Sequence, residues 1–540
     1  MLRRAWRQVA LLALPALALA CADDGPVLPG ATDGDDTPVT AVPVDPPATT
    51  TSTTTTTPTT EPDPTGDDVT EPTDPPAPSA PSTAPPTSPP DDEPPADPAV
   101  PGPPLTNAAG EHERYSGIGR LDGLGASCTA FLLDAGPPSG PAYAMTNGHC
   151  VGVFDSTTVL RDAPAEGATV TFRLFADTPT AVAEVPVQTI RYATMRGTDV
   201  AVLELATTRS AVIGLQPYAL GSPPREDADL QVVGVPVDGI PSEEWFLRSS
   251  ECTAGGRTRV VEFEWVWDEA VATDCTGIVG GSSGSPVFAG PLPVVHAIVN
   301  TTTIGATGGA TCALGQPCEV GPSGAAMAPT RTYALPVDDW DACFTPAWDP
   351  DALGCPTEQA PTTVDAPRRA VQPGATWAAT ISGGGGGPYV AKAGPISVTD
   401  CRDADGYALS ADVVDTPVGD LEGVYVLCAA ALDDRLQPDT RQAGTTVVVV
   451  DATPPTAPIE LSVVEGEDGR VLVEPVFAPP EHSSYQLKAG PAGEVDCADP
   501  GGYDVYRRIP VVVEAIPATM CVIGEDDAGN RGAPQAFTIG

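Results

Sequence analysis

The sequence has few basic side chains. Its 540 residues include 26 lysine and arginine residues against 72 aspartate and glutamate residues, so the formal net charge is -46. Proteins that bind nucleic acid neutralise phosphates with lysine and arginine, and this balance argues against such a partner. The low lysine content and the abundance of threonine, proline, alanine and glycine also disfavour a helix-rich cytosolic enzyme. They favour a soluble protein outside the cell.

The first apolar run, residues 9–20, is too short to span a bilayer. Three arginines precede it within the first seven residues, and Cys21 follows it. This order is typical of an export signal, and we expect residues 1–20 to be a signal peptide. The letters ALAC ending at Cys21 resemble the bacterial lipoprotein signal. That resemblance implies a lipid anchor on Cys21, at the outer membrane or cell surface; plain secretion is the alternative.

Residues 21–108 lack the apolar side chains that a folded core requires. The stretch 22–108 contains 16 acidic residues and no lysine or arginine, with TTSTTTTTPTT at its centre. Such a composition buries too little apolar surface to offset the entropy of ordering. We expect a disordered, acidic tether in which threonines are candidates for glycosylation.

Short apolar runs separated by glycine, proline and aspartate begin near residue 115 and continue to about residue 340. Examples are CTAFLLD, DVAVLEL, LQVVGVPV and RVVEFEWVW. Many short strands with frequent turns indicate an all-β barrel or sandwich. We assign this domain to residues 109–345.

The C-terminal third contains an internal repeat. Tyr389 and Tyr485 begin similar segments 96 residues apart, and Cys401 and Cys497 keep that spacing. Each copy has alternating apolar strands, which predicts two β-sandwich modules, residues 356–450 and 451–540. Their turns resemble those of bacterial immunoglobulin-like surface repeats, and a surface ligand of these modules is a further expectation.

Histidine is scarce, with four copies, and this narrows the search for a catalytic base. The stretch GGSSGSPVF contains Ser283, and a serine hydroxyl becomes a good nucleophile when a histidine takes its proton. His149 ends the stretch YAMTNGH and is followed by Cys150. Asp199 opens the apolar run DVAVLEL. A histidine, an aspartate and a serine therefore follow one another in settings suited to a catalytic triad.

These three stretches resemble the motifs of the chymotrypsin-like serine peptidases. The family's Thr-Ala-Ala-His-Cys corresponds to TNGHC, its Asp-Ile-Ala-Leu-Leu to DVAVL, and its Gly-Asp-Ser-Gly-Gly-Pro to GSSGSP. The resemblance covers about residues 112–345 and implies a two-barrel fold. It also implies Ser283 as nucleophile, His149 as base, Asp199 as its orienting acid, and an oxyanion hole made by the N–H groups of Gly281 and Ser283.

Departures from the family pattern also carry information. Asn147 and Gly148 replace two alanines, and Ser282 replaces the aspartate that pairs with a new N-terminal amine after zymogen cleavage. The uncharged residue at that position resembles the bacterial glutamyl-endopeptidase-like branch. We therefore expect the oxyanion hole to form without N-terminal processing.

The resemblance also places a substrate pocket, for which we expect small or apolar P1 side chains. Where trypsins have an aspartate at the pocket base, this chain has no acid. A histidine near the pocket strand, His296, is expected to pack under the barrel. The residues expected to form the pocket are Gly277, Ile298, Val299, Asn300 and Thr301.

Cysteine occurs 13 times, and setting Cys21 aside leaves 12, an even number that suits disulfides in an exported protein. The family resemblance implies Cys128–Cys150, and one bridge in each repeat would be Cys401–Cys428 and Cys497–Cys521. Within the peptidase-like domain we also expect Cys252–Cys275, Cys312–Cys318 and Cys343–Cys355, although other pairings are compatible with the sequence. No histidine, cysteine or carboxylate cluster has metal-ligand spacing, so we expect no metal and no cofactor. Acidic loops such as DCRDADG loosely resemble calcium-binding turns, but a solvated surface is the favoured interpretation.

The sequence therefore predicts an exported serine endopeptidase with a polypeptide substrate. An esterase that uses the same triad is one alternative. A surface adhesion protein, in which the peptidase-like domain is a scaffold without catalysis, is another, because a fold alone does not establish a function.

Overall fold

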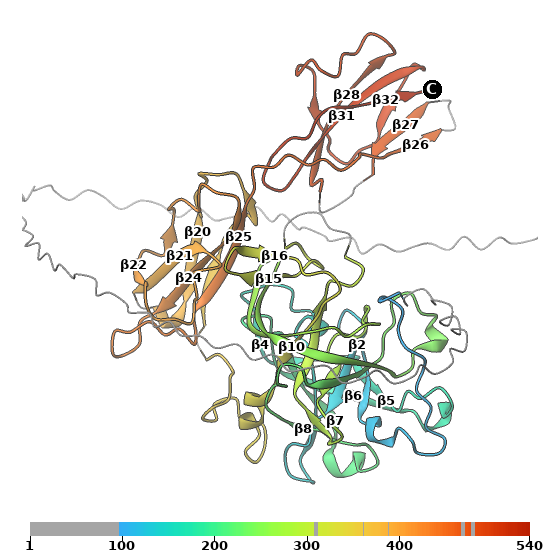
Figure 1. Ribbon diagram of the computed structural model, residues 1–540, viewed down its shortest axis with the longest axis vertical. Coiled ribbons are helices and arrows are strands. Elements are labelled where there is room, and N and C mark those ends of the chain that lie inside the picture. The colour runs from blue at the N-terminus through green and yellow to red at the C-terminus, as the bar shows by residue number, and fades with distance from the viewer. Residues whose placement is uncertain (1–96, 307–311, 360, 387, 466–469, 477–480) are drawn as a thin grey trace, which may run out of the picture. The chain divides into compact units, whose positions relative to one another are not determined.

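The structure is a computed structural model that describes residues 97–306, 312–359, 361–386, 388–465, 470–476 and 481–540 (Figure 1). The predicted signal, Cys21 and most of the predicted tether lie outside the described residues. The described residues belong to one compact unit, Asp91–Gly540. Strands dominate this part of the chain, and the predicted all-β class is confirmed. None of its helices is long and apolar enough to cross a bilayer.

Six strands form a closed first barrel. The strand order is β6-β5-β1-β2-β3-β7, and β7 pairs back to β6, so the ring has no open edge; β4 extends it beside β6. The strands are β1 (Ile118–Asp122), β2 (Cys128–Leu132), β3 (Pro141–Thr146), β4 (Val159–Pro164), β5 (Thr169–Phe172), β6 (Ala183–Thr194) and β7 (Val200–Thr208).

A second barrel closes in the same way. Its order is β11-β17-β14-β12-β9-β10, and β10 pairs with β11. The hairpin of β15 (Cys318–Gly321) and β16 (Gly324–Ala326) extends β10, and β8 (Ala219–Leu220) pairs with β13 (Val294–Val295) outside the ring. The barrel strands are β9 (Asp229–Gly234), β10 (Arg248–Glu262), β11 (Trp265–Thr273), β12 (Pro286–Phe288), β14 (Ala297–Thr302) and β17 (Thr332–Pro336).

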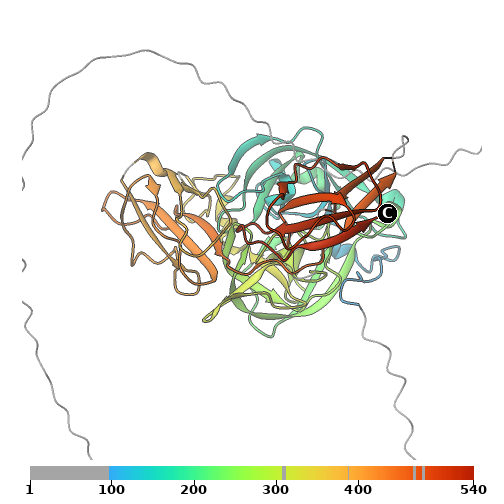
Figure 2. The ribbon, with the colours of Figure 1, turned by 90° about the horizontal axis from the view of Figure 1, so that it is seen from above.

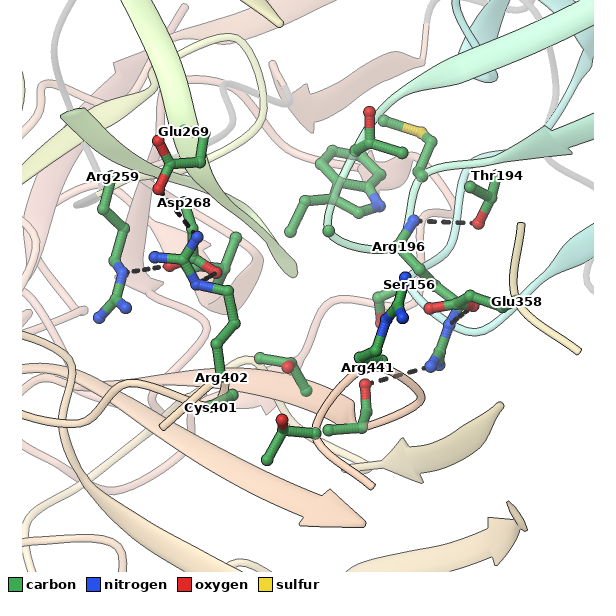
Figure 3. A pocket seen from close by; sticks show the side chains of 18 of the residues that line it. Ser156, Thr194, Arg196, Arg259, Asp268, Glu269, Glu358, Cys401, Arg402 and Arg441 are labelled. Carbon is green, nitrogen blue, oxygen red and sulfur yellow. Dashed lines mark hydrogen bonds and ion pairs between the residues drawn. The ribbon is translucent and has the colours of Figure 1, made fainter. Parts of the chain in front are cut away.

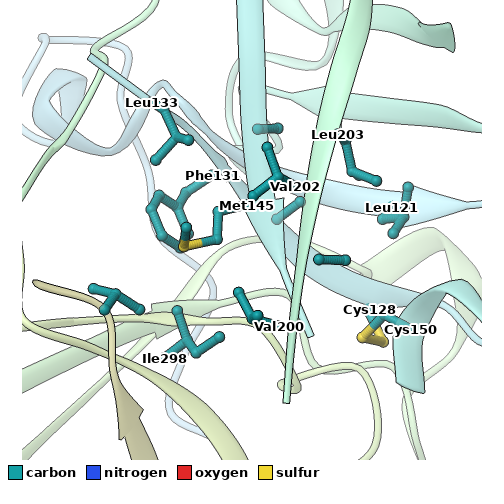
Figure 4. Packing of buried hydrophobic residues seen from close by; sticks show 14 of the residues in the cluster. Leu121, Cys128, Phe131, Leu133, Met145, Cys150, Val200, Val202, Leu203 and Ile298 are labelled. Carbon is teal, nitrogen blue, oxygen red and sulfur yellow. A yellow bond between two sulfur atoms is a disulfide. The ribbon is translucent and has the colours of Figure 1, made fainter. Parts of the chain in front are cut away.

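One apolar cluster joins the two barrels. Phe131 and Val202 from the first barrel and Ile298 from the second are at most 1% exposed and belong to the same cluster (Figure 4). Burying a side chain of this size contributes about 1.5–3 kcal/mol. The barrels are therefore fixed against each other, which matters because the candidate triad is divided between them.

The run RVVEFEWVW was expected to be one strand, but the structure folds it into a tight hairpin. The strand β10 ends at Glu262 and β11 begins at Trp265. Phe263 lies in the turn with a φ of 51°. This left-handed backbone conformation is uncommon for residues other than glycine and asparagine. No glycine, proline or asparagine marks the turn, so the apolar pattern continues across it.

The peptidase-like unit begins before the expected boundary at residue 109. The Leu105 N–H donates to the Leu247 carbonyl at 2.8 Å, and the Gly277 N–H donates to the Pro98 carbonyl at 2.7 Å. The Asn107 N–H donates to Asp177 Oδ1 at 2.7 Å. Residues 97–107, which we call the N-terminal arm, therefore belong to the folded domain and not to the tether.

Short 3-10 helices connect the strands. They are η1 (Glu113–Tyr115), η2 (His149–Val151), η3 (Pro179–Ala181), η4 (Arg209–Val212), η5 (Ser242–Glu244), η6 (Asp338–Cys343) and η7 (Gly384–Gly386). The helix η2 begins at His149, so it carries the candidate base.

The C-terminal third forms two modules, each made of two sheets (Figures 1 and 2). In each module, apolar residues from its two sheets form a core that belongs to that module alone. The first module contains β18 (Thr362–Asp365), β19 (Ala370–Val371), β20 (Ala379–Gly383), β21 (Tyr389–Pro395), β22 (Ala408–Ser410), β23 (Val413–Val414), β24 (Gly423–Ala431) and β25 (Gly444–Val450). The second contains β26 (Leu461–Glu465), β27 (Val471–Pro475), β28 (Ser484–Pro491), β29 (Asp504–Val505), β30 (Val511–Val513), β31 (Ala518–Glu525) and β32 (Gln535–Ile539). Their kinship with immunoglobulin-like repeats stays a prediction.

Each module orders its acidic loop around a lysine. Lys392 Nζ donates to the carbonyls of Asp403 and Asp405 at 2.5 and 2.9 Å. In the second module Lys488 donates to the carbonyls of Asp499 and Gly501. These carbonyls converge on an ammonium group, which gives the DCRDADG loop its cation from within the chain.

All six expected cysteine pairs are disulfides in the structure. The Cys128–Cys150 bond links β2 to the helix η2 that carries His149. This bond ties the turn of the candidate base to the wall of the first barrel.

Candidate active site

His149 is held in a turn with little free space. The strand β3 ends at Thr146, and η2 begins three residues later. A side chain at Gly148 would place its Cβ 2.2 Å from the Thr194 carbonyl oxygen, so alanine cannot occupy this position without a shift of the backbone. Asn147 Nδ2 donates to the Asp199 carbonyl at 2.9 Å. These contacts give a physical reason for the two departures from the family motif.

The Asp199 carboxylate orients the His149 ring through two bonds. His149 Nδ1 lies 2.6 Å from Asp199 Oδ2, and the His149 N–H donates to Oδ1 at 3.1 Å. The Asp199 side chain is 0% exposed, while that of His149 is 18% exposed. The buried acid therefore fixes the ring, with Nδ1–H directed at the carboxylate and Nε2 left to accept a proton.

The pKa of His149 is raised above its ordinary value. Burial lowers this pKa, but the charge and hydrogen bond of Asp199 raise it more, and the charge of Glu262 adds to the increase. The raised pKa means that the protein stabilises the imidazolium, the form that a catalytic base must adopt after accepting a proton.

The loop carrying Ser283 is fastened to both barrels. The Thr129 N–H in β2 donates to the Ser283 carbonyl at 2.8 Å, and the Gly284 N–H donates to the Val299 carbonyl in β14 at 2.9 Å. Gly284 has a φ of 81°, and a Cβ there would lie 2.2 Å from the Thr129 carbonyl oxygen and 2.4 Å from Thr146 Oγ1. The motif therefore requires glycine after the candidate nucleophile.

Thr129 also holds the other end of this loop. Its hydroxyl donates to the Gly281 carbonyl at 2.8 Å and accepts from the Val235 N–H at 2.9 Å. Its own carbonyl accepts from Thr146 Oγ1 at 2.7 Å. One buried threonine thus connects the strand before the candidate base to the loop of the candidate nucleophile.

The peptide between Gly280 and Gly281 is turned so that its N–H is free. The Gly280 carbonyl accepts from the N–H groups of Val237 and Asp238 at 2.8 and 3.0 Å. A trans peptide places its N–H opposite its carbonyl, so the Gly281 N–H points away from these donors. Within the described residues neither the Gly281 N–H nor the Ser283 N–H has a hydrogen-bond acceptor. Both predicted oxyanion donors are therefore available to a ligand.

The Ser283 hydroxyl makes no hydrogen bond to any described residue, His149 included. Such bonds are often long in unliganded enzymes and tighten when substrate binds. What the structure brings together is the oriented His149–Asp199 pair and a serine loop fixed to the adjacent strand.

A cavity of about 290 Å³ adjoins Ser283. Val299, Asn300 and Thr301, three of the predicted pocket residues, line it. Its other described lining residues are Ile278, Val279, Gly280, Thr302, Ile304, Gly305, Ala306 and Gly315, and none of these carries a charge. A larger cavity of about 560 Å³, shown in Figure 3, does not include Ser283. The smaller cavity is therefore the one that the candidate nucleophile lines.

Two predicted pocket residues lie elsewhere. Gly277 is covered by the N-terminal arm, since a Cβ there would lie 2.8 Å from Pro101 Cα. Ile298 is 1% exposed and belongs to the core that joins the barrels. His296 is outside the cavity, and its Nδ1 lies 2.6 Å from the Ser222 carbonyl oxygen.

Cys128, His149 and Cys150 are the one group of three metal-ligand side chains that lie close together within the described residues. Both sulfurs belong to the Cys128–Cys150 disulfide and offer no thiolate. This grouping therefore reflects the anchoring of the His149 turn.

Sequence reasoning missed the residues that support the site from a distance. Thr129, Val237 and Asp238 hold the serine loop, and Asn147 holds Asp199, yet no local pattern distinguishes them from ordinary strand and turn residues. The replacement of the family's alanine by Asn147 was the one available signal.

Residues 128–291 match the model of the trypsin-like peptidase domain. Because of this match, the chain contains a trypsin-like peptidase domain. The matched range includes His149, Asp199 and Ser283. No curated protein matches the chain.

Several solved structures resemble part of the chain. A thermostable serine protease, AL20, from an extremophilic microorganism is 16% identical, covers 42% of this chain and 92% of its own, and has a TM-score of 0.27. The protease Anisep from Arthrobacter nicotinovorans is also 16% identical, covers 46% and 98%, and has a TM-score of 0.27. An inactivated protease paralogue from the scabies mite is 12% identical, covers 42% and 92%, and has a TM-score of 0.28. Likeness at this level says nothing about activity.

Proposed function

We propose that the protein is a serine endopeptidase that cleaves polypeptides through Ser283, His149 and Asp199. The observation that carries the proposal is a pair of N–H groups without acceptors on the Ser283 loop, in the same domain as an oriented histidine. The Gly281 and Ser283 N–H groups have no internal acceptor in the described chain, and His149 is held by a fully buried Asp199.

The proposed reaction proceeds through an acyl-enzyme. His149 Nε2 takes the hydroxyl proton as Ser283 Oγ attacks the scissile carbonyl, and the two N–H groups stabilise the negative oxygen that forms. His149 then gives the proton to the leaving amine, and a water molecule, activated by the same histidine, releases the acyl group. Each oxyanion donor contributes about 3 kcal/mol to transition-state stabilisation.

The proposed P1 preference is for small or medium uncharged side chains. The cavity beside Ser283 has a volume of about 290 Å³, and none of its described lining residues carries a charged side chain. A charged P1 group would lose its hydration there without gaining a counter-ion.

We also propose that the protein is exported and anchored by a lipid on Cys21. The arginine-rich start, the short apolar run and the position of that cysteine support this part of the proposal. The acidic tether would then hold the peptidase domain away from the membrane.

A fluorophosphonate probe tests the proposed chemistry on residues 91–540, which retain the N-terminal arm. The parent, Ser283→Ala and the matched control Ser282→Ala would be labelled and then incubated with a peptide library. Labelling and cleavage by the parent and by Ser282→Ala, but not by Ser283→Ala, would support the triad. Labelling without peptide cleavage would favour the esterase alternative. A folded parent that reacts with neither would overturn the proposal, and the C-terminal modules would then become the candidates for a surface-binding role.

A further inference from the structure

The turn between β6 and β7 presents the catalytic carboxylate. The strand β6 ends at Thr194 and β7 begins at Val200, so residues 195–199 form the connection that carries Asp199. Met195 is 3% exposed and packs in the core. The position of the carboxylate therefore depends on what holds this short connection.

Arg196 is a second buried charged residue of this turn, in addition to Asp199, with a side chain that is 4% exposed. Its Nε donates to Glu358 Oε2 at 2.6 Å (Figure 3). Its Nη2 donates to the Ala443 carbonyl at 3.2 Å. Its backbone N–H donates to Thr194 Oγ1 at 3.1 Å. These bonds fix the Arg196 side chain and the start of the turn.

The partner groups of Arg196 come from beyond the peptidase barrels. Glu358 follows the last disulfide of the domain, and Ala443 lies in the first β-sandwich module. The Glu358 side chain is 14% exposed, and its backbone N–H donates to the Tyr192 hydroxyl in β6 at 3.3 Å. Burial raises the pKa of Glu358, and the nearby charge of Arg196 opposes that increase. Removing one member of such a buried pair leaves the other without compensation, so the turn would rearrange.

We propose that Arg196 is a positioning residue for Asp199 and that Glu358 and the Ala443 carbonyl hold Arg196 in place. This inference rests on the proposed function, because it assigns the role through the triad. The first β-sandwich module thereby becomes part of the support of the catalytic site.

The test measures the pKa of His149 by NMR in the full chain with [15N]histidine, which has four histidine residues to resolve. The charged groups that act on His149 are Asp199 and Glu262. In Arg196→Met, Asp199 is held less firmly, so we expect the pKa of His149 to fall by about half a unit or more. The Nδ1 proton resonance should move or broaden.

Arg191→Met is the matched control. Arg191 lies on β6, before the turn, and its Nε donates to Glu204 Oε2 at 2.8 Å. Its other ion pair among the described residues is with Asp162. The variant should lower the melting temperature and leave the His149 pKa unchanged. Equal pKa values in Arg196→Met and wild type would overturn the proposal. If Arg196→Met does not fold, the same measurement is made on Glu358→Gln. The glutamine amide oxygen can still accept the hydrogen bond from Arg196 Nε, but the negative charge that pairs with Arg196 is removed.

Kinetics per labelled active site give a second measurement. A misplacement of about 1 Å at a catalytic group costs on the order of 10²-fold in rate. We therefore expect kcat to fall by roughly 10–100-fold in Arg196→Met with KM nearly constant, and Arg196→Lys to recover part of the loss. The NMR experiment does not require turnover, so an inactive wild type would refute the peptidase proposal while the His149 pKa still tested the role of Arg196.

Discussion

Replacing Thr129 with valine should disable the oxyanion hole while leaving the shape of the core intact. Thr129 is 0% exposed, and its hydroxyl bridges the Gly281 carbonyl and the Val235 N–H. Valine keeps the volume and the backbone bonds but leaves both groups unpaired. At about 1–3 kcal/mol for each buried unpaired group, the free energy of unfolding should fall by about 4 kcal/mol. That loss corresponds to a decrease in Tm of roughly 8–16 °C in a domain of this size.

The catalytic effect separates this account from a simple loss of stability. The Gly281–Ser282 peptide, which adjoins the donating Gly281 N–H, would no longer be fixed by the hydroxyl. A shift of this loop that removes one oxyanion donor costs about 10²–10³-fold in kcat. The assay is ester hydrolysis at 25 °C, divided by the concentration of sites titrated with a fluorophosphonate. Thr129→Ser, which keeps the hydroxyl and loses one methyl group, should cost about 1 kcal/mol and leave kcat per site near the parent value. A Thr129→Val protein that melts earlier but keeps the parent kcat would refute the reasoning.

Further predictions concern the Ser283 loop, the His149–Asp199 pair and the N-terminal arm. Gly284→Ala should lower the free energy of unfolding by about 3–5 kcal/mol, because the new Cβ would collide with Thr129 and the backbone there is left-handed. The control is Gly239→Ala, which is also at positive φ but has no neighbour within 4 Å, and it should lower the free energy of unfolding by about 1–2 kcal/mol. Thermal melts of both variants measure the difference. The hydrolysis rate should rise with pH as His149 loses its proton, with a midpoint above the ordinary histidine pKa of about 6.5. A midpoint below about 6 would contradict the raised pKa of His149. Asp199→Asn should lower kcat on the order of 10⁴-fold. A chain that begins at residue 109 should lose activity relative to one that begins at residue 91, because the N-terminal arm covers Gly277; mass spectrometry of the labelled longer chain should show an uncleaved N-terminus.

Much of the fold could be predicted because barrel strands bury alternate or successive apolar residues. The stretch DVAVLEL became β7, and the repeat spacing located both C-terminal modules. The hairpin at Phe263 could not be predicted, since its left-handed turn residue is an aromatic side chain inside a continuous apolar pattern. The N-terminal arm was also missed, because its proline-rich composition matches that of the preceding tether and its partners are far along the chain.

The candidate site shows the same division between local and distant information. His149, Asp199 and Ser283 stand in short motifs, and the family motif around His149 implied the Cys128–Cys150 disulfide that the structure shows. Thr129 and Arg196 act through contacts with residues more than 100 positions away, and a lone threonine or arginine carries no local signal of such a partner. The family comparison could not supply them either, because a motif records the reacting groups and not the contacts that hold them.

The lysine-centred loops of the two modules have a consequence for experiments. Lys392 and Lys488 are the two lysines of the entire sequence, and each ammonium is held by backbone carbonyls and lies 4.5 Å from a tyrosine ring. Chelators cannot remove a cation that is bonded to the chain. An amine-acylating reagent must compete with the hydrogen bonds that these carbonyls accept, so the rate of acylation at each half-buried lysine reports how often its loop releases the ammonium group. The chain thus contains one built-in reporter of loop order in each C-terminal module.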